Sequence, residues 1–359
     1  MTTTPASRRR LQAITLIGGT LLALALGLWL RPAAHSLPEE EHGDPALAAS
    51  IRDLTDGRPS AVAVGVVQDG QIRTASIGAP LEGTYEIGSI TKGNTGVLYV
   101  DAVERGEIEP GTTLAEVFGL GDVPAADVTL EQLSQHASGL PRLVGGVDTF
   151  VRGTVATLLA RDPYQLSTED NIARLASMDT DGSTPLYSNY GLTILGHALA
   201  ERAGLRYDVL VAERVAGPLG LDSFRIPTSA DDLGEHAVQG RDATGRRQQA
   251  WTGLADAPAG AIRADVGDMA ELARALLAGE APGVAALDPV ADLDEDRIGA
   301  GWITSEHEGM TYTWHNGGTG GFRAWLGLDR ASGTAVVVLA ATSASVDEAG
   351  LQLLLEVSR

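Results

Sequence analysis

The sequence contains a single lysine, Lys92, which stands three residues after Ser89. The 25 other basic residues are arginines, whose guanidinium keeps its proton in proteins, whereas a lysine amine can lose one. Serine favours a helix N-terminus, and residues three apart on a helix project from the same face. A serine hydroxyl becomes nucleophilic when a neighbouring base takes its proton, and a helix N-terminus offers N–H groups to an oxyanion. The pair therefore predicts nucleophilic catalysis at Ser89, with Lys92 as the base.

Tyr187-Ser188-Asn189 is the first of two downstream segments with candidate side chains. A tyrosine beside a cation ionises more easily than usual, so Tyr187 is a candidate base or proton relay. The Asn189 amide can hold the lysine or a substrate amide. On these residues alone, a core tyrosine with one satisfied hydroxyl is the alternative.

His315-Asn316-Gly317-Gly318 is the second segment. Glycines along a strand edge let a ligand approach the backbone closely, so His315 and the Gly318 N–H can meet a substrate carbonyl or carboxylate. A glycine-rich hairpin with a surface histidine is the alternative. The sequence has no His-Glu-x-x-His, no Walker A loop and no Gly-x-Ser-x-Gly elbow, which removes three competing site types.

The composition excludes several classes of protein. A formal net charge of −21 excludes a general nucleic-acid binder, because the phosphate backbone requires a basic surface. The absence of cysteine excludes disulfides, thiolate zinc sites, iron–sulfur clusters, a cysteine nucleophile and a lipid-anchored lipoprotein.

Beyond about residue 46, strand patterns lie near both ends of the sequence. The segment between them, from about residue 90 to 280, is mostly helical in pattern. The expected strands are 60–68, 71–77, 301–305, 311–315, 322–328 and 334–341. The expected helices are 46–54, 97–103, 190–203, 269–277 and 346–357. This order predicts an α+β fold in which one antiparallel sheet is built from both ends of the chain and covered by helices.

Residues 11–30 form an uncharged, mostly apolar run between the arginines at 8–10 and Arg31. About 20 such residues, at ~1.5 Å each, span a hydrocarbon core of about 30 Å. The arginine cluster is expected to remain in the cytoplasm. We therefore predict a cytoplasmic N-terminus at 1–10, a single-pass transmembrane helix at 11–30, a polar linker at 31–45 and an extracytoplasmic domain at 46–359. A cleaved signal, which would release a secreted domain, is the alternative.

In this order the three segments resemble motifs of serine hydrolases of the β-lactamase and penicillin-binding-protein superfamily, especially its class C β-lactamase-like branch. Ser89 to Lys92 resembles the Ser-x-x-Lys motif, 187–189 the Tyr-x-Asn motif and 315–317 the third motif. Residues 130–140 and 257–270 resemble two supporting segments of the family. The resemblance covers about residues 46–359.

The resemblance implies a helix–sheet–helix sandwich with a helical subdomain beside it and the active site between them. Ser89 would be acylated, and Lys92 and Tyr187 would share proton transfer. Asn189 would orient the lysine and the substrate. No metal or organic cofactor is implied.

The resemblance further implies an oxyanion hole made by the backbone N–H groups of Ser89 and Gly318, with His315 and Gly317 lining the pocket.

Two positions depart from the family pattern. Asn94 stands where an aromatic residue is frequent, which affects local packing. The third motif begins with His315 instead of lysine, and a neutral histidine is a weaker partner for a carboxylate.

The sequence thus predicts a membrane-anchored, extracytoplasmic serine hydrolase that works through an acyl-enzyme. The expected substrates are small molecules or peptides: an ester, an amide or a D-amino-acid peptide. A penicillin-binding or cell-wall-fragment sensor with little turnover, and a β-lactamase, are the alternatives. The membrane is the expected partner of the N-terminal helix, no nucleic-acid partner is expected, and the oligomeric state stays open.

Overall fold

The computed structural model describes residues 36–359, apart from 57, 144–146, 164–165, 179 and 181–184, together with residues 19, 20 and 27. The chain divides into two units, Met1–Ala34 and His35–Arg359, and the second contains the sheet and nearly all of the described residues. Apart from those three residues, the predicted segments 1–10 and 11–30 lie outside the described residues. Among the described residues, no helix is long and apolar enough to cross a membrane.

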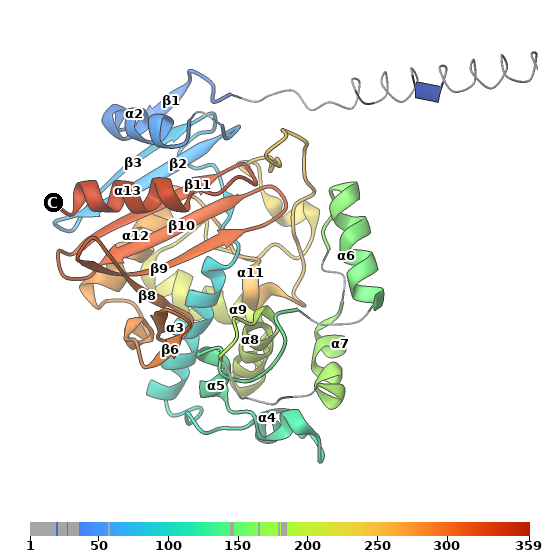
Figure 1. Cartoon of the computed structure of the whole chain (residues 1–359). Coiled ribbons are helices and arrows are strands. Elements are labelled where there is room, and N and C mark those ends of the chain that lie inside the picture. Colours follow the sequence, from blue (N-terminus) through green and yellow to red (C-terminus); the bar gives the residue numbers. More distant parts are fainter. Residues whose placement is uncertain are drawn as a thin grey trace, which may run out of the picture. The chain divides into compact units, whose positions relative to one another are not determined.

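One antiparallel sheet dominates the second unit, as predicted, and nine strands form it in the described part of the chain (Figure 1). Its order is β1 (Glu41–Gly43), β3 (Gln71–Ile77), β2 (Val62–Gln68), β11 (Thr334–Ala340), β10 (Arg323–Asp329), β9 (Met310–Gly318), β8 (Ile303–His307), β7 (Asp296–Ile298) and β6 (Ala291–Leu293). Strands from the two ends of the chain meet at its centre, where Val62 on β2 pairs with Ala340 on β11. A separate pair joins β4 (Tyr85–Glu86) to β5 (Arg263–Ala264).

Helices cover both faces of the sheet (Figure 1). The α-helices of the described chain are α2 (Pro45–Leu54), α3 (Ile90–Glu104), α4 (Leu114–Phe118), α5 (Leu130–Ser134), α6 (Val147–Leu159), α7 (Thr168–Ala173), α8 (Asn189–Ala203), α9 (Tyr207–Val211), α10 (Gly217–Leu219), α11 (Ala257–Gly260), α12 (Val266–Ala278) and α13 (Asp347–Val357). Several of them, α4, α5, α7, α9 and α11, pack on α8 and form a helical part beside the sheet. Helices α2 and α13 cover one face, and α12 and α3 pack on the other. Because both faces are covered, β11 is buried along its whole length, which explains its continuous apolar sequence.

The segment predicted to be a polar linker at 31–45 contains ordered structure. Glu41–Gly43 form β1, which pairs with β3, and Asp44 caps α2 by accepting the N–H groups of Ala46 and Leu47. Leu37 is buried under α2. Edge strands commonly carry charged residues, so a short edge strand is difficult to distinguish from a linker in sequence.

Helix α3 approaches the loop before β8 closely enough to require glycine. A Cβ on Gly96 would stand 1.7 Å from the carbonyl oxygen of Ala300, and one on Gly93 would stand 2.5 Å from the Trp302 ring. The neighbouring Asn94 is buried and donates its side-chain N–H to the carbonyl of Ile90. The unusual Gly93-Asn94 pair therefore fits a helix that lies directly against this loop, with Trp302 filling the space.

Candidate active site

Ser89 and Lys92 meet at the start of α3, as their spacing predicts. Ser89 is the residue immediately before the helix, and its Oγ lies 2.8 Å from Lys92 Nζ. The Lys92 amine also donates to the carbonyl oxygen of Ala259 on α11, at 2.7 Å. Two contacts therefore fix the end of the lysine side chain against the serine hydroxyl.

The surroundings of Lys92 favour its uncharged form. The side chain is fully buried, and burial lowers its pKa well below the ordinary value, with a smaller contribution in the same direction from the charge of Arg142. A neutral amine has a free lone pair and can accept the proton of Ser89.

Tyr187 lies on the other side of the serine. Its ring centroid is 5.2 Å from Lys92 Nζ, and the Ser89 side chain is close enough to affect its pKa. The sequence argument expected a nearby cation to promote ionisation of this tyrosine. Burial instead raises the pKa of Tyr187 to about 12 and outweighs the effects of Ser89 and of the Arg142 charge, which both lower it. The free site therefore holds a protonated tyrosine beside a lysine whose surroundings favour its neutral form.

The end of β9 packs directly on the turn that carries Ser89. A Cβ on Gly317 would stand 1.8 Å from the carbonyl oxygen of Ile87 and 3.1 Å from Ser89 N. A Cβ on Gly88, whose φ is +54°, would stand 2.5 Å from Gly318 N. Only glycine permits this approach, which brings the backbone N–H groups of Ser89 and Gly318 close together, as an oxyanion hole requires.

His315 is buried in the site, so the surface-hairpin alternative is wrong. Burial lowers its pKa to about 3. Its Nδ1 lies 2.6 Å from the carbonyl oxygen of Asn316, which can only accept, so Nδ1 carries the proton and Nε2 is an acceptor. The structure thus places an uncharged histidine 6.1 Å from the Tyr187 ring, measured between centroids.

Asn189 begins α8, and its backbone N–H donates to the carbonyl of Arg142 at 3.0 Å. Its side-chain Oδ1 is buried and makes no hydrogen bond within the described part of the chain, as is also true of His315 Nε2. These atoms are free to bind a substrate or water. The structure therefore brings six of the seven sequence-predicted site residues together, and it places Asn189 at the start of α8, two residues after Tyr187.

His136 is a site residue that the sequence argument did not single out. Its Nδ1 accepts the backbone N–H of Ser188 at 3.0 Å, and its ring lies 4.5 Å from that of Tyr187, between centroids. Burial lowers its pKa well below the ordinary value, with smaller contributions from Lys92 and His315. It lies within the segment 130–140 that resembles the family, and this was the only signal in the sequence.

A buried ion pair just before the nucleophile was also missed. Glu86 Oε1 lies 3.1 Å from Arg263 Nη1, and both side chains are almost completely buried. Glu86 also accepts the N–H of Trp251 at 2.9 Å. The pair links β4, which precedes the Ser89 turn, to β5. The two residues are 177 positions apart in the chain, so no sequence pattern indicates that they pair.

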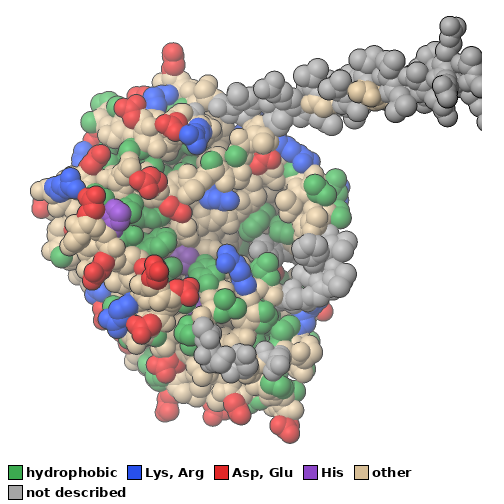
Figure 2. All heavy atoms as spheres, viewed as in Figure 1, with side chains coloured by type: hydrophobic (Ala, Val, Ile, Leu, Met, Phe, Trp, Pro, Cys, Tyr) green, Lys and Arg blue, Asp and Glu red, His purple; other side chains and the backbone are tan. Residues whose placement is uncertain are grey.

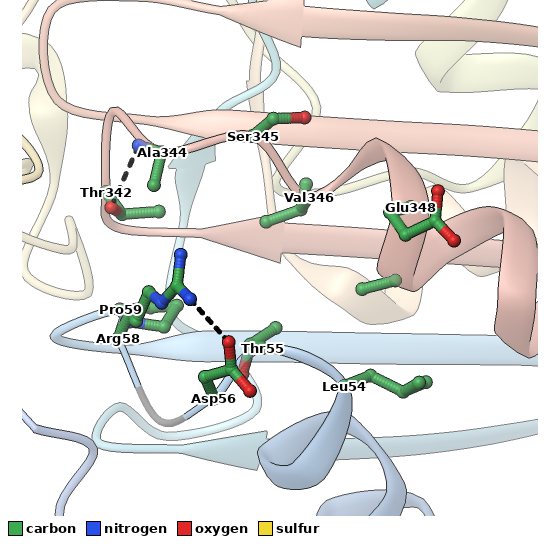
Figure 3. Close-up of a pocket in the computed structure, with 11 residues that line it drawn as sticks. Leu54, Thr55, Asp56, Arg58, Pro59, Thr342, Ala344, Ser345, Val346 and Glu348 are labelled. Carbon is green, nitrogen blue, oxygen red and sulfur yellow. Dashed lines mark hydrogen bonds and ion pairs between the residues drawn. The ribbon is translucent and has the colours of Figure 1, made fainter.

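Two other kinds of site find little support among the described residues. No group of three histidine or acidic side chains there could hold a metal ion. A pocket between the end of α2 and the start of α13, shown in Figure 3, is lined by Asp56, Arg58 and Thr342 among others. The polar side chains of this pocket bind groups of the protein itself: Asp56 and Arg58 pair with each other at 2.6 Å, and Thr342 accepts the N–H of Ala344. These contacts give no sign of a ligand site there.

Comparisons with known proteins agree with the fold. A family model described as Beta-lactamase matches residues 47–357. Penicillin-binding protein 4 of Amycolatopsis lactamdurans is 25% identical over 330 residues, which cover 83% of this chain and 81% of that protein.

Two solved structures have the same fold. A class C beta lactamase from Rhodobacter sphaeroides has a TM-score of 0.74 at 20% identity and covers 88% of this chain and 98% of its own. A beta-lactamase/D-alanine carboxypeptidase from Pseudomonas syringae has a TM-score of 0.73 at 14% identity and covers 87% and 98%. Fold and comparisons together define a serine hydrolase. The chain belongs to the beta-lactamase family, within the superfamily of β-lactamases and penicillin-binding proteins.

Proposed function

We propose that this protein is a membrane-anchored, extracytoplasmic enzyme that forms an acyl-enzyme at Ser89 with a small ester, amide or D-amino-acid peptide. The contact between Lys92 Nζ and Ser89 Oγ, at 2.8 Å, carries this proposal, because the amine is buried and its pKa is low. The apolar run at 11–30 supports the anchor, and the arginines at 8–10 support the extracytoplasmic orientation of the domain.

The acylation step follows from the geometry. Ser89 Oγ attacks the substrate carbonyl while its proton moves to Lys92 Nζ. The oxyanion that forms is held by the N–H groups of Ser89 and Gly318. Tyr187, which is protonated, gives its proton to the leaving group and regains one from Lys92, so the leaving group departs neutral. A water molecule then releases the acyl group by the same steps in reverse.

The substrate class follows from the third motif. At neutral pH His315 is uncharged, because its pKa is about 3, so it gives a carboxylate no ionic partner. This favours an ester, amide or D-amino-acid peptide over an efficient β-lactamase reaction. The names of two similar proteins, penicillin-binding protein 4 and a beta-lactamase/D-alanine carboxypeptidase, support a peptide substrate.

Hydrolysis of 4-nitrophenyl butyrate by the full-length protein in nonionic detergent tests the proposal. We expect turnover by the wild type and none by Ser89→Ala, because no other group can form the acyl-enzyme. Ser332→Ala is the matched control, since Ser332 lies in the turn at the far end of β10, about 20 Å along the strand from Gly318. Equal turnover by wild type and Ser89→Ala would refute the proposal. A stable Ser89 adduct with penicillin, without turnover, would instead favour the sensor.

A further inference from the structure

Arg142 lies beside Tyr187. Its side chain is exposed, and its guanidinium carbon lies 5.3 Å from the centroid of the Tyr187 ring. Its backbone carbonyl accepts the N–H groups of Asn189 and Tyr190, at 3.0 and 3.4 Å. The start of α8 therefore fixes the backbone of Arg142 beside the catalytic tyrosine, while the guanidinium remains accessible to a ligand.

The charges around the site differ from those of the whole protein. The chain carries a net charge of −21, and acidic side chains are spread over the face shown in Figure 2. Yet the charged or titratable groups that act on Lys92, Tyr187, His136 and His315 are Arg142, Lys92 and His315, with no carboxylate among them. The ion pairs between described residues do not include Arg142.

His315 is uncharged at neutral pH, and the Lys92 amine is buried against Ser89 and Ala259. The Arg323 guanidinium lies near Gly318 but already donates to the carbonyls of Thr319 and Phe322. Arg142 is therefore an exposed cation of this site with a guanidinium that can bind a ligand. An exposed cation in a partly enclosed site attracts anions, and a guanidinium binds a carboxylate through two parallel hydrogen bonds.

We propose that Arg142 is a specificity-determining residue that binds a carboxylate of the substrate. The inference rests on the proposed function and narrows its substrate class to esters, amides or peptides with a carboxylate near the bond that is broken. Arg142 thereby provides, from the loop after α5, the cation that the third motif lacks at His315.

Matched pairs of esters test this role in the full-length protein. Butyryl and hemisuccinyl esters of 4-nitrophenol differ by a carboxylate on the acyl group. Phenyl butyrate and 4-(butyryloxy)benzoate differ by a carboxylate on the leaving group. The measurement is the ratio of kcat/KM for the anionic ester to that for its neutral partner, in wild type and in Arg142→Gln.

We expect Arg142→Gln to lower this ratio by about 10- to 100-fold for at least one pair, because charge-assisted hydrogen bonds are lost. Arg142→Lys should retain part of the preference. Arg359→Gln removes an exposed arginine that follows α13, on the opposite face of the sheet, and should leave both ratios unchanged. If Arg142→Gln does not fold, rising salt concentration should still reduce the anionic preference of the wild type.

Two outcomes would overturn the inference. One is an unchanged ratio for both pairs of esters while the neutral esters are still hydrolysed. The other is a wild-type preference for the anionic esters that salt does not affect.

The pH profile distinguishes a second role for Arg142. Because the Arg142 charge lowers the pKa of Lys92 and Tyr187, its loss should also move the acidic limb of the pH profile to higher pH. That shift with constant ratios would assign Arg142 to pKa control alone. Absence of Ser89-dependent turnover of the neutral esters would contradict the proposed function instead.

Discussion

The two faces of the central sheet differ in what they bury. Under α2 and α13 the layer consists of apolar side chains such as Val64, Val338 and Leu354. On the face covered by α3 and α12, the apolar core also encloses Lys92, the Glu86–Arg263 pair and other buried polar groups. The first face stabilises the fold, whereas the second holds groups whose burial opposes folding.

The free energies of burying apolar and polar side chains have opposite signs. Burying a leucine side chain stabilises a protein by about 1.5–3 kcal/mol. Removing a polar group from water without full compensation costs about 1–3 kcal/mol, and more for a charge. Burial favours the neutral form of Lys92, which is the form that a base requires. The unfavourable surroundings of the amine are therefore part of the chemistry of the site.

The sharpest test of the contrast is Lys92→Met, which removes the amine and keeps a chain of similar shape. We expect kcat/KM for 4-nitrophenyl butyrate to fall by about 10²- to 10⁴-fold, because the general base is lost. The free energy of unfolding in urea should fall by no more than about 1 kcal/mol, because a buried polar group is removed along with its contacts.

Lys92→Arg is the companion variant. It introduces a permanent cation that cannot supply a neutral base, so activity should also be lost. Its stability should fall, since a buried guanidinium replaces a neutral amine. Near-normal activity in either variant would rule out the base role. A large loss of stability in Lys92→Met would show that the face of the sheet covered by α3 and α12 also depends on this residue for folding.

The opposite face should respond in the opposite way. Leu354→Ala removes a fully buried side chain of α13, and we expect the free energy of unfolding to fall by about 2–5 kcal/mol. The kcat/KM of the folded enzyme should remain unchanged, because Leu354 lies in the apolar layer on the opposite face of the sheet from Ser89 and Lys92. Leu351→Ala, on the same helix but only partly buried, should cost less stability. A loss of activity in folded Leu354→Ala would contradict the separation of the two faces.

The sequence predicted the sheet and its covering helices because their patterns are local. The strand from Thr334 to Ala340 and the helix from Asp347 to Val357 were both expected within one residue of their observed ends. The Ser89–Lys92 contact was also predictable, since it depends only on spacing along one helix. Uniting it with Tyr187 and His315 required the resemblance to the family, because these residues come from distant parts of the chain.

What the sequence did not predict depends on three-dimensional surroundings. The sign of the Tyr187 pKa shift was wrong, because the extent of burial cannot be read from a tyrosine and its neighbours in sequence. Arg142 gave no signal as one of many arginines, and its role follows from the backbone contacts that place it at α8. The carbonyl of Ala259 that binds Lys92 carries no side-chain signature at all.

The smallest expected effect concerns His136, which contacts the site without taking part in the chemistry. His136→Phe keeps a ring beside Tyr187 but leaves the buried N–H of Ser188 without an acceptor, which should cost about 1–3 kcal/mol of stability. His136→Asn restores an acceptor and suits the φ of +58° at this position, so it should recover stability but not the ring contact.

If His136 positions Tyr187, both variants should lower kcat with little change in KM, because proton donation to the leaving group is impaired after the substrate has bound. The Phe variant separates the two contacts, since it alone retains the ring. Wild-type kcat in both variants would show that Tyr187 is held by the start of α8 without help from this histidine. A fall in kcat for Phe but not for Asn would assign the positioning to the Ser188 hydrogen bond, and the reverse would assign it to the ring contact.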